Sequence, residues 1–310
     1  MKIGFLGLIL LQINMIFGGY KDFVIVIPSY NNEWWCEENF TSALNQDYPS
    51  EHYQIIYIND CSTDQTLAKV VEITNASAKK NIVTIINNTV RKGALQNFYE
   101  VINQLCAPHK VVVNLDGDDW LDGVDVLGYL NQVYADANVW LTYGRYRYFP
   151  YDSNFVPGAT AYPTHVIRKS AFRTSDFRAS HLRTYYAWLF QRIKAVDLKD
   201  GQGNFYSMCP DLAIMYPMLE MSCERHFCSD RVLCVYNNTN PLNENKVNVD
   251  LLLEVAKEIR QKPKYSRLPG ATKKPVNSTK VNLKKESVRQ RRKPVSPKNK
   301  SVKRRNKSSI

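Results

Sequence analysis

The run Phe23–Ile27, FVIVI, followed directly by the loop PSYNN at residues 28–32, is the stretch that decides the fold class. An unbroken apolar run rich in β-branched residues predicts a strand buried on both faces, and the proline and polar residues after it predict that the strand stops there. Further runs of this kind follow along the chain at Tyr53–Ile58, Ile82–Ile86 and Lys110–Leu115.

Helical patterns fill the intervals between these runs. The predicted helices are Trp34–Asn45, Asp64–Ala78, Ala94–Leu105 and Val124–Tyr134. Short strands that alternate with longer helices predict an α/β fold, in which helices cover both faces of a parallel sheet. Such sheets bind ligands at the carboxyl ends of their strands. We therefore look for function in the loops that follow the strands.

Composition separates a globular body from a basic C-terminal segment. The chain has 310 residues, of which 44% are hydrophobic, and this excludes a wholly disordered chain. Of the net charge of +12, residues 264–310 contribute +16, because they hold seventeen Lys or Arg and one acid, Glu286; the rest of the chain carries −4. A segment of this composition cannot bury a core, so we expect residues 263–310 to be a disordered tail.

The basic tail has three interpretations: an electrostatic contact for anionic membrane lipids, a contact for acidic glycans or nucleic acid, or a solvated spacer. Membrane or polyanion association is the favoured one, and a nucleic-acid-binding protein on a globular carrier is an alternative for the whole chain. Since aromatic residues are not interleaved with its cations, no specific nucleic acid is expected as a partner. The seven cysteines of the chain include no Cys-x-x-Cys pair, which argues against a zinc site.

The N-terminus resembles a targeting segment. Lys2 precedes the apolar run Ile3–Phe17, which ends at Gly18-Gly19. This arrangement predicts a signal peptide or a membrane anchor within residues 1–20, and hence a secretory or membrane-associated protein. The run is short for a bilayer span, and a peripheral helix of a cytoplasmic protein is the alternative.

Three loops carry residues suited to a nucleotide. Tyr30, after the first strand, offers a face for stacking on a base, or packs under the sheet edge. Asp60, after the second strand, can accept hydrogen bonds from a base or ribose, although residues of this loop also suit a helix cap. Arg91-Lys92-Gly93 precedes a predicted helix N-terminus, which suits a diphosphate; a solvated basic turn is the alternative.

An acidic cluster, Asp116-Gly117-Asp118-Asp119, follows the fourth strand. Carboxylates this close repel one another, and a hard divalent cation that also binds substrate phosphates would relieve the repulsion. A solvated acidic turn is less attractive, because Val111–Val113 before the cluster and Trp120-Leu121 after it place the acids at a buried edge. We expect Mn²⁺ or Mg²⁺ as the cofactor.

Taken together, these motifs resemble the family 2 glycosyltransferases. The resemblance is carried by the segments VIVIPSYNN (24–32), TSALNQDYPSEHYQIIYINDCSTDQT (41–66), RKGALQN (91–97) and VVNLDGDDWL (112–121). It implies the GT-A fold, with a Rossmann-like, mostly parallel sheet, over residues 21–262. It also implies a nucleotide-sugar half at 22–130 and an acceptor half at 145–245.

The resemblance further implies roles for individual residues. The nucleotide-binding residues would be Pro28, Tyr30, Asp60, Arg91, Lys92 and Asp116. Asp118 and Asp116 would bind the metal, with Asp119 able to share this role. The catalytic base would be Asp211, in the step Pro210-Asp211 before an apolar helix, although an Asp in this position also caps helices. His181, Arg183 and Trp120 are candidates for contacts to the acceptor or to phosphate.

The implied reaction is an inverting, metal-dependent transfer of sugar from a nucleotide-sugar, first among them a UDP-sugar, to a hydroxyl of a glycan, lipid or protein. Asp211 would take the acceptor proton in a single displacement. The alternative is a catalytically inactive protein of the same fold that binds nucleotide-sugars or glycans.

Overall fold

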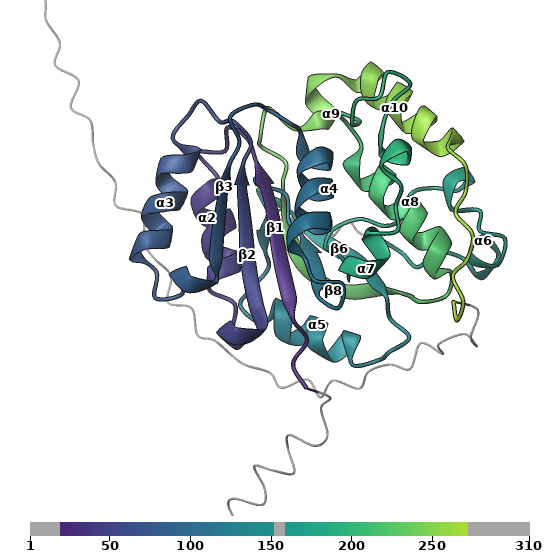
Figure 1. Ribbon diagram of the computed structural model, residues 1–310, viewed down its shortest axis with the longest axis horizontal. Helices are drawn as coiled ribbons and strands as arrows, with labels where there is room; N and C mark the ends of the chain where they lie inside the picture. Colours follow the sequence, from purple (N-terminus) through teal and green to yellow (C-terminus); the bar gives the residue numbers. More distant parts are fainter. Residues whose placement is uncertain (1–18, 152–158, 272–310) are drawn as a thin grey trace, which may run out of the picture. The chain divides into compact units, whose positions relative to one another are not determined.

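In the computed structural model, the described residues, 19–151 and 159–271, contribute eight strands to one sheet (Figure 1). The strand order is β3(Val83–Asn87), β2(Tyr53–Asn59), β1(Phe23–Ser29), β4(Val111–Asn114), β7(Arg183–Tyr186), β6(Leu141–Phe149), β8(His226–Asn237) and β5(Trp120–Leu121). The first four strands of this order pair in parallel, as the sequence predicts. β7 is antiparallel to both of its neighbours, β6 and β8 are parallel, and β5 is antiparallel to β8. The α/β prediction is therefore confirmed, with a mixed sheet.

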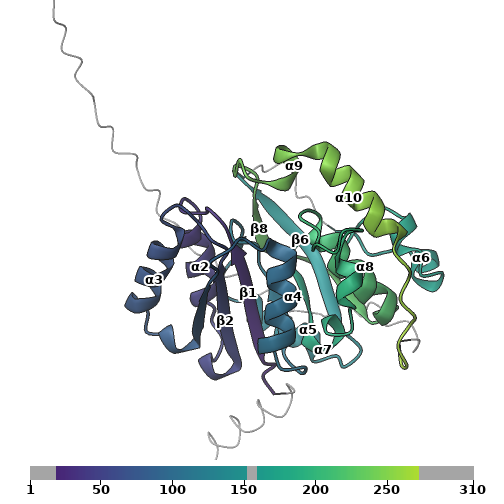
Figure 2. The same ribbon diagram turned by 45° about the horizontal axis from the view of Figure 1, so that its top comes forward.

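Side chains of the central strands alternate between two apolar cores. Phe23, Ile25 and Ile27 of β1 pack on the side of α2(Cys36–Leu44) and α5(Val126–Tyr134). Val24 and Val26 pack on the other side, which is covered by α4(Ala94–Leu105) and α8(Pro210–Ser222) (Figure 2). Because every residue of β1 is buried, the strand reads as a continuous apolar run rather than an alternating one.

The remaining helices are short or peripheral. They are α3(Thr66–Ala76), α6(Thr164–Arg168), α7(Ala187–Phe190), α9(Glu244–Val247) and α10(Val249–Gln261), with 3₁₀ turns at Ser50–His52, Lys80–Ile82, Phe172–Thr174 and Ala195–Leu198. None of the helices in the described part of the chain is long and apolar enough to cross a membrane. The expected targeting segment lies almost wholly in residues 1–18, outside the described residues.

The first strand extends through Pro28 to Ser29, two residues past its expected end. The carbonyl of Val26 accepts a hydrogen bond from Leu115, on the side of β4. Alternation along the strand directs the nitrogen of Pro28 to the same side, beyond the last paired residue of β4. The missing N–H therefore costs no ladder hydrogen bond, and proline is tolerated.

The expectation of a disordered tail from residue 263 onward is wrong for residues 263–271, which pack on the body of the protein. The Tyr265 N–H donates to Glu220 Oε2 at 3.0 Å, and the Leu268 N–H donates to the carbonyl of Met221 at 3.0 Å. Tyr265 and Leu268 have hydrophobic side chains that pack against the core of the body. The average composition of the basic segment does not reveal two such residues. Residues 272–310, the rest of the expected tail, lie outside the described residues.

Candidate active site

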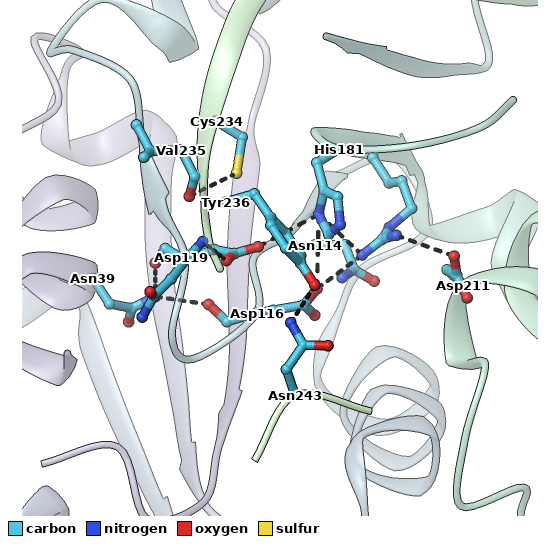
Figure 3. Close-up of polar contacts among 12 residues, drawn as sticks. Asn39, Asn114, Asp116, Asp119, His181, Asp211, Cys234, Val235, Tyr236 and Asn243 are labelled. Atoms are coloured by element: carbon cyan, nitrogen blue, oxygen red, sulfur yellow. Dashed lines mark hydrogen bonds and ion pairs between the residues drawn. The ribbon is translucent and has the colours of Figure 1, made fainter. Parts of the chain in front are cut away.

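The acidic turn between β4 and β5 lies directly against the end of β1. A Cβ added to Gly117 would stand 2.7 Å from the carbonyl oxygen of Pro28 and 2.7 Å from Ser29 Oγ, so only glycine permits this approach. On the other side, the Nδ2 of Asn39 from α2 donates to the carbonyls of Asp116 at 2.9 Å and of Asp119 at 2.6 Å (Figure 3). The turn is thus held by α2 and pressed onto the loop after β1.

The carboxylates of this turn are crowded, and that of Asp119 is buried. Asp119 is 1% exposed; its Oδ1 accepts from the Asn237 N–H at 2.9 Å, and its Oδ2 has no hydrogen-bond partner among the described residues. Asp118 Oδ2 accepts from Asn240 Nδ2 at 2.7 Å. Burial, with Asp116 nearby, raises the pKa of Asp118 to about 6. Burial and the other two carboxylates raise the pKa of Asp119 well above its ordinary value.

A buried arginine connects the acidic turn to the expected base. Arg183 of β7, with 5% of its side chain exposed, places Nη2 3.0 Å from Asp116 Oδ2 and Nη1 3.7 Å from Asp211 Oδ2. Asp211 lies in the first turn of α8, after Pro210. Burial raises the pKa of Asp211, and the Arg183 guanidinium opposes this rise. Burial would lower the pKa of Arg183, but the surrounding carboxylates raise it, so the guanidinium stays charged.

Asp116, Arg183 and Asp211 line one narrow pocket. The other lining residues are Phe98, Asn114, Pro210 and Ile214. Figure 3 shows Asp116 and Asp211 on opposite sides of this region. The pocket therefore brings together acids from the turn after β4 and from the start of α8.

His181 lies beside the same carboxylates and the same arginine. Its Nδ1 is 3.4 Å from Arg183 Nη2, 3.6 Å from Asp119 Oδ2 and 3.7 Å from Asp116 Oδ2. Burial and the Arg183 guanidinium lower the pKa of His181 well below its ordinary value, so the ring is neutral. Its Nδ1 lone pair then accepts the Arg183 N–H.

Ligand atoms of Asp119, His181 and Cys234 lie within 4.8 Å of one another, a mixed oxygen, nitrogen and sulfur set that would suit zinc. The Arg183 guanidinium already occupies the Nδ1 side of His181, however, and a second cation there would be repelled. Burial also raises the pKa of the Cys234 thiol well above its ordinary value. This cluster is therefore a poor metal site as it stands.

Asp60 organises the basic loop from beneath. The carboxylate is 3% exposed and accepts from the Lys92 N–H at 2.9 Å, the Gly93 N–H at 2.8 Å and Asn88 Nδ2 at 2.9 Å. Burial alone would raise the pKa of Asp60, but hydrogen bonds to the carboxylate outweigh it and lower the pKa. Asp60 thus fixes the loop at the N-terminus of α4, where Gly93 adopts φ +83°.

The two cations of this loop have different partners. The guanidinium of Arg91 lies 3.8 Å from the centre of the Tyr30 ring, so the first and third loops meet. The Nζ of Lys92 instead pairs with Glu100 Oε2 of α4 at 2.7 Å. Within residues 19–151 and 159–271, Arg91 has no carboxylate partner, which leaves it as the loop cation available to a ligand.

The structure brings most of the expected site residues into two neighbouring groups, one at the loops after β1, β2 and β3 and one around the acidic turn. Pro28, Tyr30, Asp60 and Arg91 surround the loops after β1, β2 and β3, and Gly117 joins them to the acidic turn. Trp120, expected to contact the acceptor or phosphate, instead packs its ring against that of Phe149, with ring centres 5.2 Å apart.

Sequence reasoning missed three asparagines. Asn39 is wholly buried on the apolar face of α2, Asn237 donates its N–H to Asp119, and Asn240 donates to Asp118. A polar residue on an otherwise apolar helix face was the available signal for Asn39. Nothing local marks the other two, because they reach the turn from the far end of β8.

Comparison with known proteins now adds to this geometry. Residues 24–195 match the family model described as "Glycosyl transferase family 2". The poly(ribitol-phosphate) beta-N-acetylglucosaminyltransferase TarS of Staphylococcus aureus is 26% identical over 118 residues, which cover 37% of this chain and 20% of TarS. The Escherichia coli protein WfgD, named as a UDP-Glc:alpha-D-GlcNAc-diphosphoundecaprenol beta-1,3-glucosyltransferase, is 24% identical over 183 residues, or 53% of this chain and 67% of WfgD. The chain thus spans about a fifth of the length of TarS.

Solved structures share the fold. TarS residues 1–349 in complex with UDP-GlcNAc superpose with a TM-score of 0.54 at 17% identity, covering 77% of this chain and 65% of that one. The Pyrobaculum calidifontis mannosyltransferase PcManGT, in complex with GDP-Man and Mn²⁺, gives a TM-score of 0.52 at 18% identity and covers 80% and 66%. The family match covers more than half of the chain, from β1 through the acidic turn to beyond Arg183, and the fold agrees with it: this chain belongs to the family 2 glycosyltransferases and has the GT-A fold.

Proposed function

We propose that the chain transfers a sugar from a nucleotide-sugar, first among them a UDP-sugar, to a hydroxyl of a glycan, lipid or protein, with inversion at the anomeric carbon. The observation that carries this proposal is the pocket in which Asp211 faces Asp116 of the acidic turn. Relatives support it, since TarS and WfgD are named as transferases of N-acetylglucosamine and glucose. The solved relatives hold UDP-GlcNAc or GDP-Man.

The loops after β1, β2 and β3 would hold the nucleotide. The Tyr30 ring would stack against the base. Because the Arg91 guanidinium lies over this ring in the structure, the base would enter beside these two side chains. Arg91 and the backbone at the N-terminus of α4 would face the diphosphate. Asp60 would contact the base or ribose and also hold this loop in place. The ammonium of Lys92 would support the loop through its ion pair with Glu100.

The acidic turn fits a divalent cation, Mn²⁺ or Mg²⁺. Carboxylates crowd there, and the buried Oδ2 of Asp119 lacks a partner among the described residues, a condition that a nearby cation would relieve. Asp116 and Asp118 would be its protein ligands, with Asp119 beside them. When bound, such a cation offsets the negative charge of the departing diphosphate.

Asp211 would act as the general base. Its Oδ2 takes the proton of the acceptor hydroxyl while the hydroxyl oxygen forms a bond to the anomeric carbon. The bond from that carbon to the diphosphate oxygen breaks, and its electron pair leaves with the nucleoside diphosphate. A carboxylate with a raised pKa is a stronger base than one with the ordinary pKa, which suits this role.

A donor screen tests the function. The full chain is incubated with Mn²⁺ and UDP-, GDP- or CDP-sugars, and thermal unfolding is followed by assays for donor cleavage and sugar transfer. We expect stabilisation by UDP-sugars and turnover of the donor that stabilises. Stabilisation without any cleavage or transfer would favour a binding protein of the same fold, and the absence of any nucleotide effect would contradict both.

The chain ends give two further proposals. Residues 1–20 would direct the chain to the secretory pathway or anchor it to a membrane, and the basic residues of 272–310 would contact anionic lipids or other polyanions. Sedimentation with phosphatidylserine vesicles, for the full chain and for a chain ended after Ala271, tests the second. Equal binding by both would contradict it.

A further inference from the structure

Within residues 19–151 and 159–271, Arg183 is the one residue that pairs with a carboxylate on each side of the pocket. It lies on β7, opposite Asn114 of β4, so the sheet fixes its backbone in the middle of the molecule. The side chain is 5% exposed. A buried guanidinium requires compensating charge, and Asp116 and Asp211 supply it.

The two contacts are unequal. Nη2 hydrogen-bonds Asp116 Oδ2 at 3.0 Å, whereas Nη1 lies 3.7 Å from Asp211 Oδ2, an ion pair without a hydrogen bond. The hydrogen bond ties the guanidinium to the acidic turn. The longer contact attracts the Asp211 carboxylate toward the pocket but leaves Oδ2 free to accept a proton.

We propose that Arg183 is a positioning residue for sugar transfer, which holds the Asp211 carboxylate at a set place across the pocket from Asp116. This inference rests on the proposed function, in which Asp211 is the base. It replaces the phosphate contact expected of Arg183 from the sequence, because both ends of the guanidinium are already engaged by carboxylates. His181 supports the same role by accepting the Arg183 Nη2–H at 3.4 Å.

Lysine at position 183 separates the two contacts. An ammonium is a single point of charge on a flexible stem and cannot serve two carboxylates on opposite sides as a planar guanidinium does. We expect Arg183→Lys to keep the closer contact to Asp116 and to lose the hold on Asp211. Donor affinity would then stay within about threefold, while kcat for transfer falls about 10–100-fold, the scale of a misplaced reacting group.

The test measures Arg183→Lys and Arg183→Gln in the full chain, together with Asp211→Asn and the double variant Arg183→Lys/Asp211→Asn. Calorimetry gives the Kd of UDP with Mn²⁺, steady-state assays give kcat and KM for transfer, and thermal unfolding reports folding. Arg173→Lys is the matched control, because Arg173 is also buried and paired with a carboxylate, Glu220 at 2.7 Å, outside the pocket. It should affect stability and leave the ratio of kcat to donor affinity unchanged.

If Arg183 acts through Asp211, the lysine variant lowers kcat in the native background and has no further effect on the residual transfer of Asp211→Asn. Equal losses in both backgrounds, a loss confined to donor affinity, or an unchanged kcat in a folded Arg183→Lys protein would each overturn the inference. Full transfer by Asp211→Asn would instead remove the base from the proposed function, so the two failures are distinguishable. If the glutamine variant does not fold, the lysine comparison still decides.

Discussion

The three carboxylates of the acidic turn differ because their surroundings differ. Asp119 is buried and accepts the Asn237 N–H, Asp118 accepts from Asn240, and Asp116 is paired with Arg183. Raised pKa values of Asp118 and Asp119 record the cost of burying like charges together. On the proposed function, these acids would serve the reaction at a cost to the stability of the fold.

Replacing one of these acids separates the two effects. Asp118→Asn should abolish metal-dependent donor cleavage, while the melting temperature stays equal or rises because one buried like charge is removed. Donor cleavage with and without Mn²⁺, and thermal unfolding, measure this. Asp250→Asn, at an exposed position on α10, is the control. Unchanged turnover of Asp118→Asn would take this residue out of the mechanism.

His226 gives a prediction about pH. Burial lowers its pKa from 6.5 to about 4, outweighing its hydrogen bond to the Cys223 carbonyl. The folded state therefore binds fewer protons than the unfolded state between these values, so stability is full above pH 6.5 and falls as the pH drops toward 4. At about 1.4 kcal/mol per pKa unit, the loss is at most about 3.5 kcal/mol. Urea unfolding from pH 7 to 4 should show a shallower pH dependence for His226→Asn; equal slopes would contradict the assignment.

At the scale of elements, the site depends on how closely separate segments approach. The acidic turn touches the end of β1 only because Gly117 has no side chain, and α2 holds the turn through Asn39. The basic loop keeps its place above β2 because Asp60 accepts its backbone N–H groups. None of these loops is positioned by its own local sequence alone.

A pair of glycine substitutions tests this packing. Gly117→Ala should destabilise the protein by about 1–3 kcal/mol, as overpacking does, and should weaken UDP binding because the turn moves from the β1 loop. Gly128→Ala is the matched control, since a Cβ there meets nothing within 4 Å and alanine favours the helix α5 by about 0.5–1 kcal/mol. Urea unfolding and calorimetry with UDP measure both. A Gly117→Ala protein as stable as the parent would show that the turn is not confined.

At the scale of the whole molecule, one sheet joins the two halves expected from the sequence. β7, β6 and β8 extend the sheet beyond the parallel strands. Arg183, His181 and Asn237 therefore approach the acidic turn from the second half of the chain. Residues 263–271 belong to this body, because Tyr265 and Leu268 bond to α8.

Two truncations test whether residues 263–271 stabilise the body. A chain ended after Lys262 leaves the buried Glu220 without the Tyr265 N–H, a loss of about 1–3 kcal/mol for a buried polar group. It should therefore melt several degrees below a chain ended after Ala271, given about 2–4 °C per kcal/mol for a domain of this size. Thermal unfolding of both, side by side, measures the difference. Equal melting temperatures would show that residues 263–271 add nothing.

The sequence by itself determined the first four strands, their helices and the loops that carry the nucleotide and metal candidates. These features depend on apolar runs, helical periodicity and motifs, which are local along the chain. Tertiary structure alone decided which partners those side chains have: Arg183 between Asp116 and Asp211, Lys92 on Glu100, and the asparagines around the acidic turn. Such pairings join residues far apart in the sequence, and their distances depend on how sheet, helices and loops pack, which no local pattern specifies.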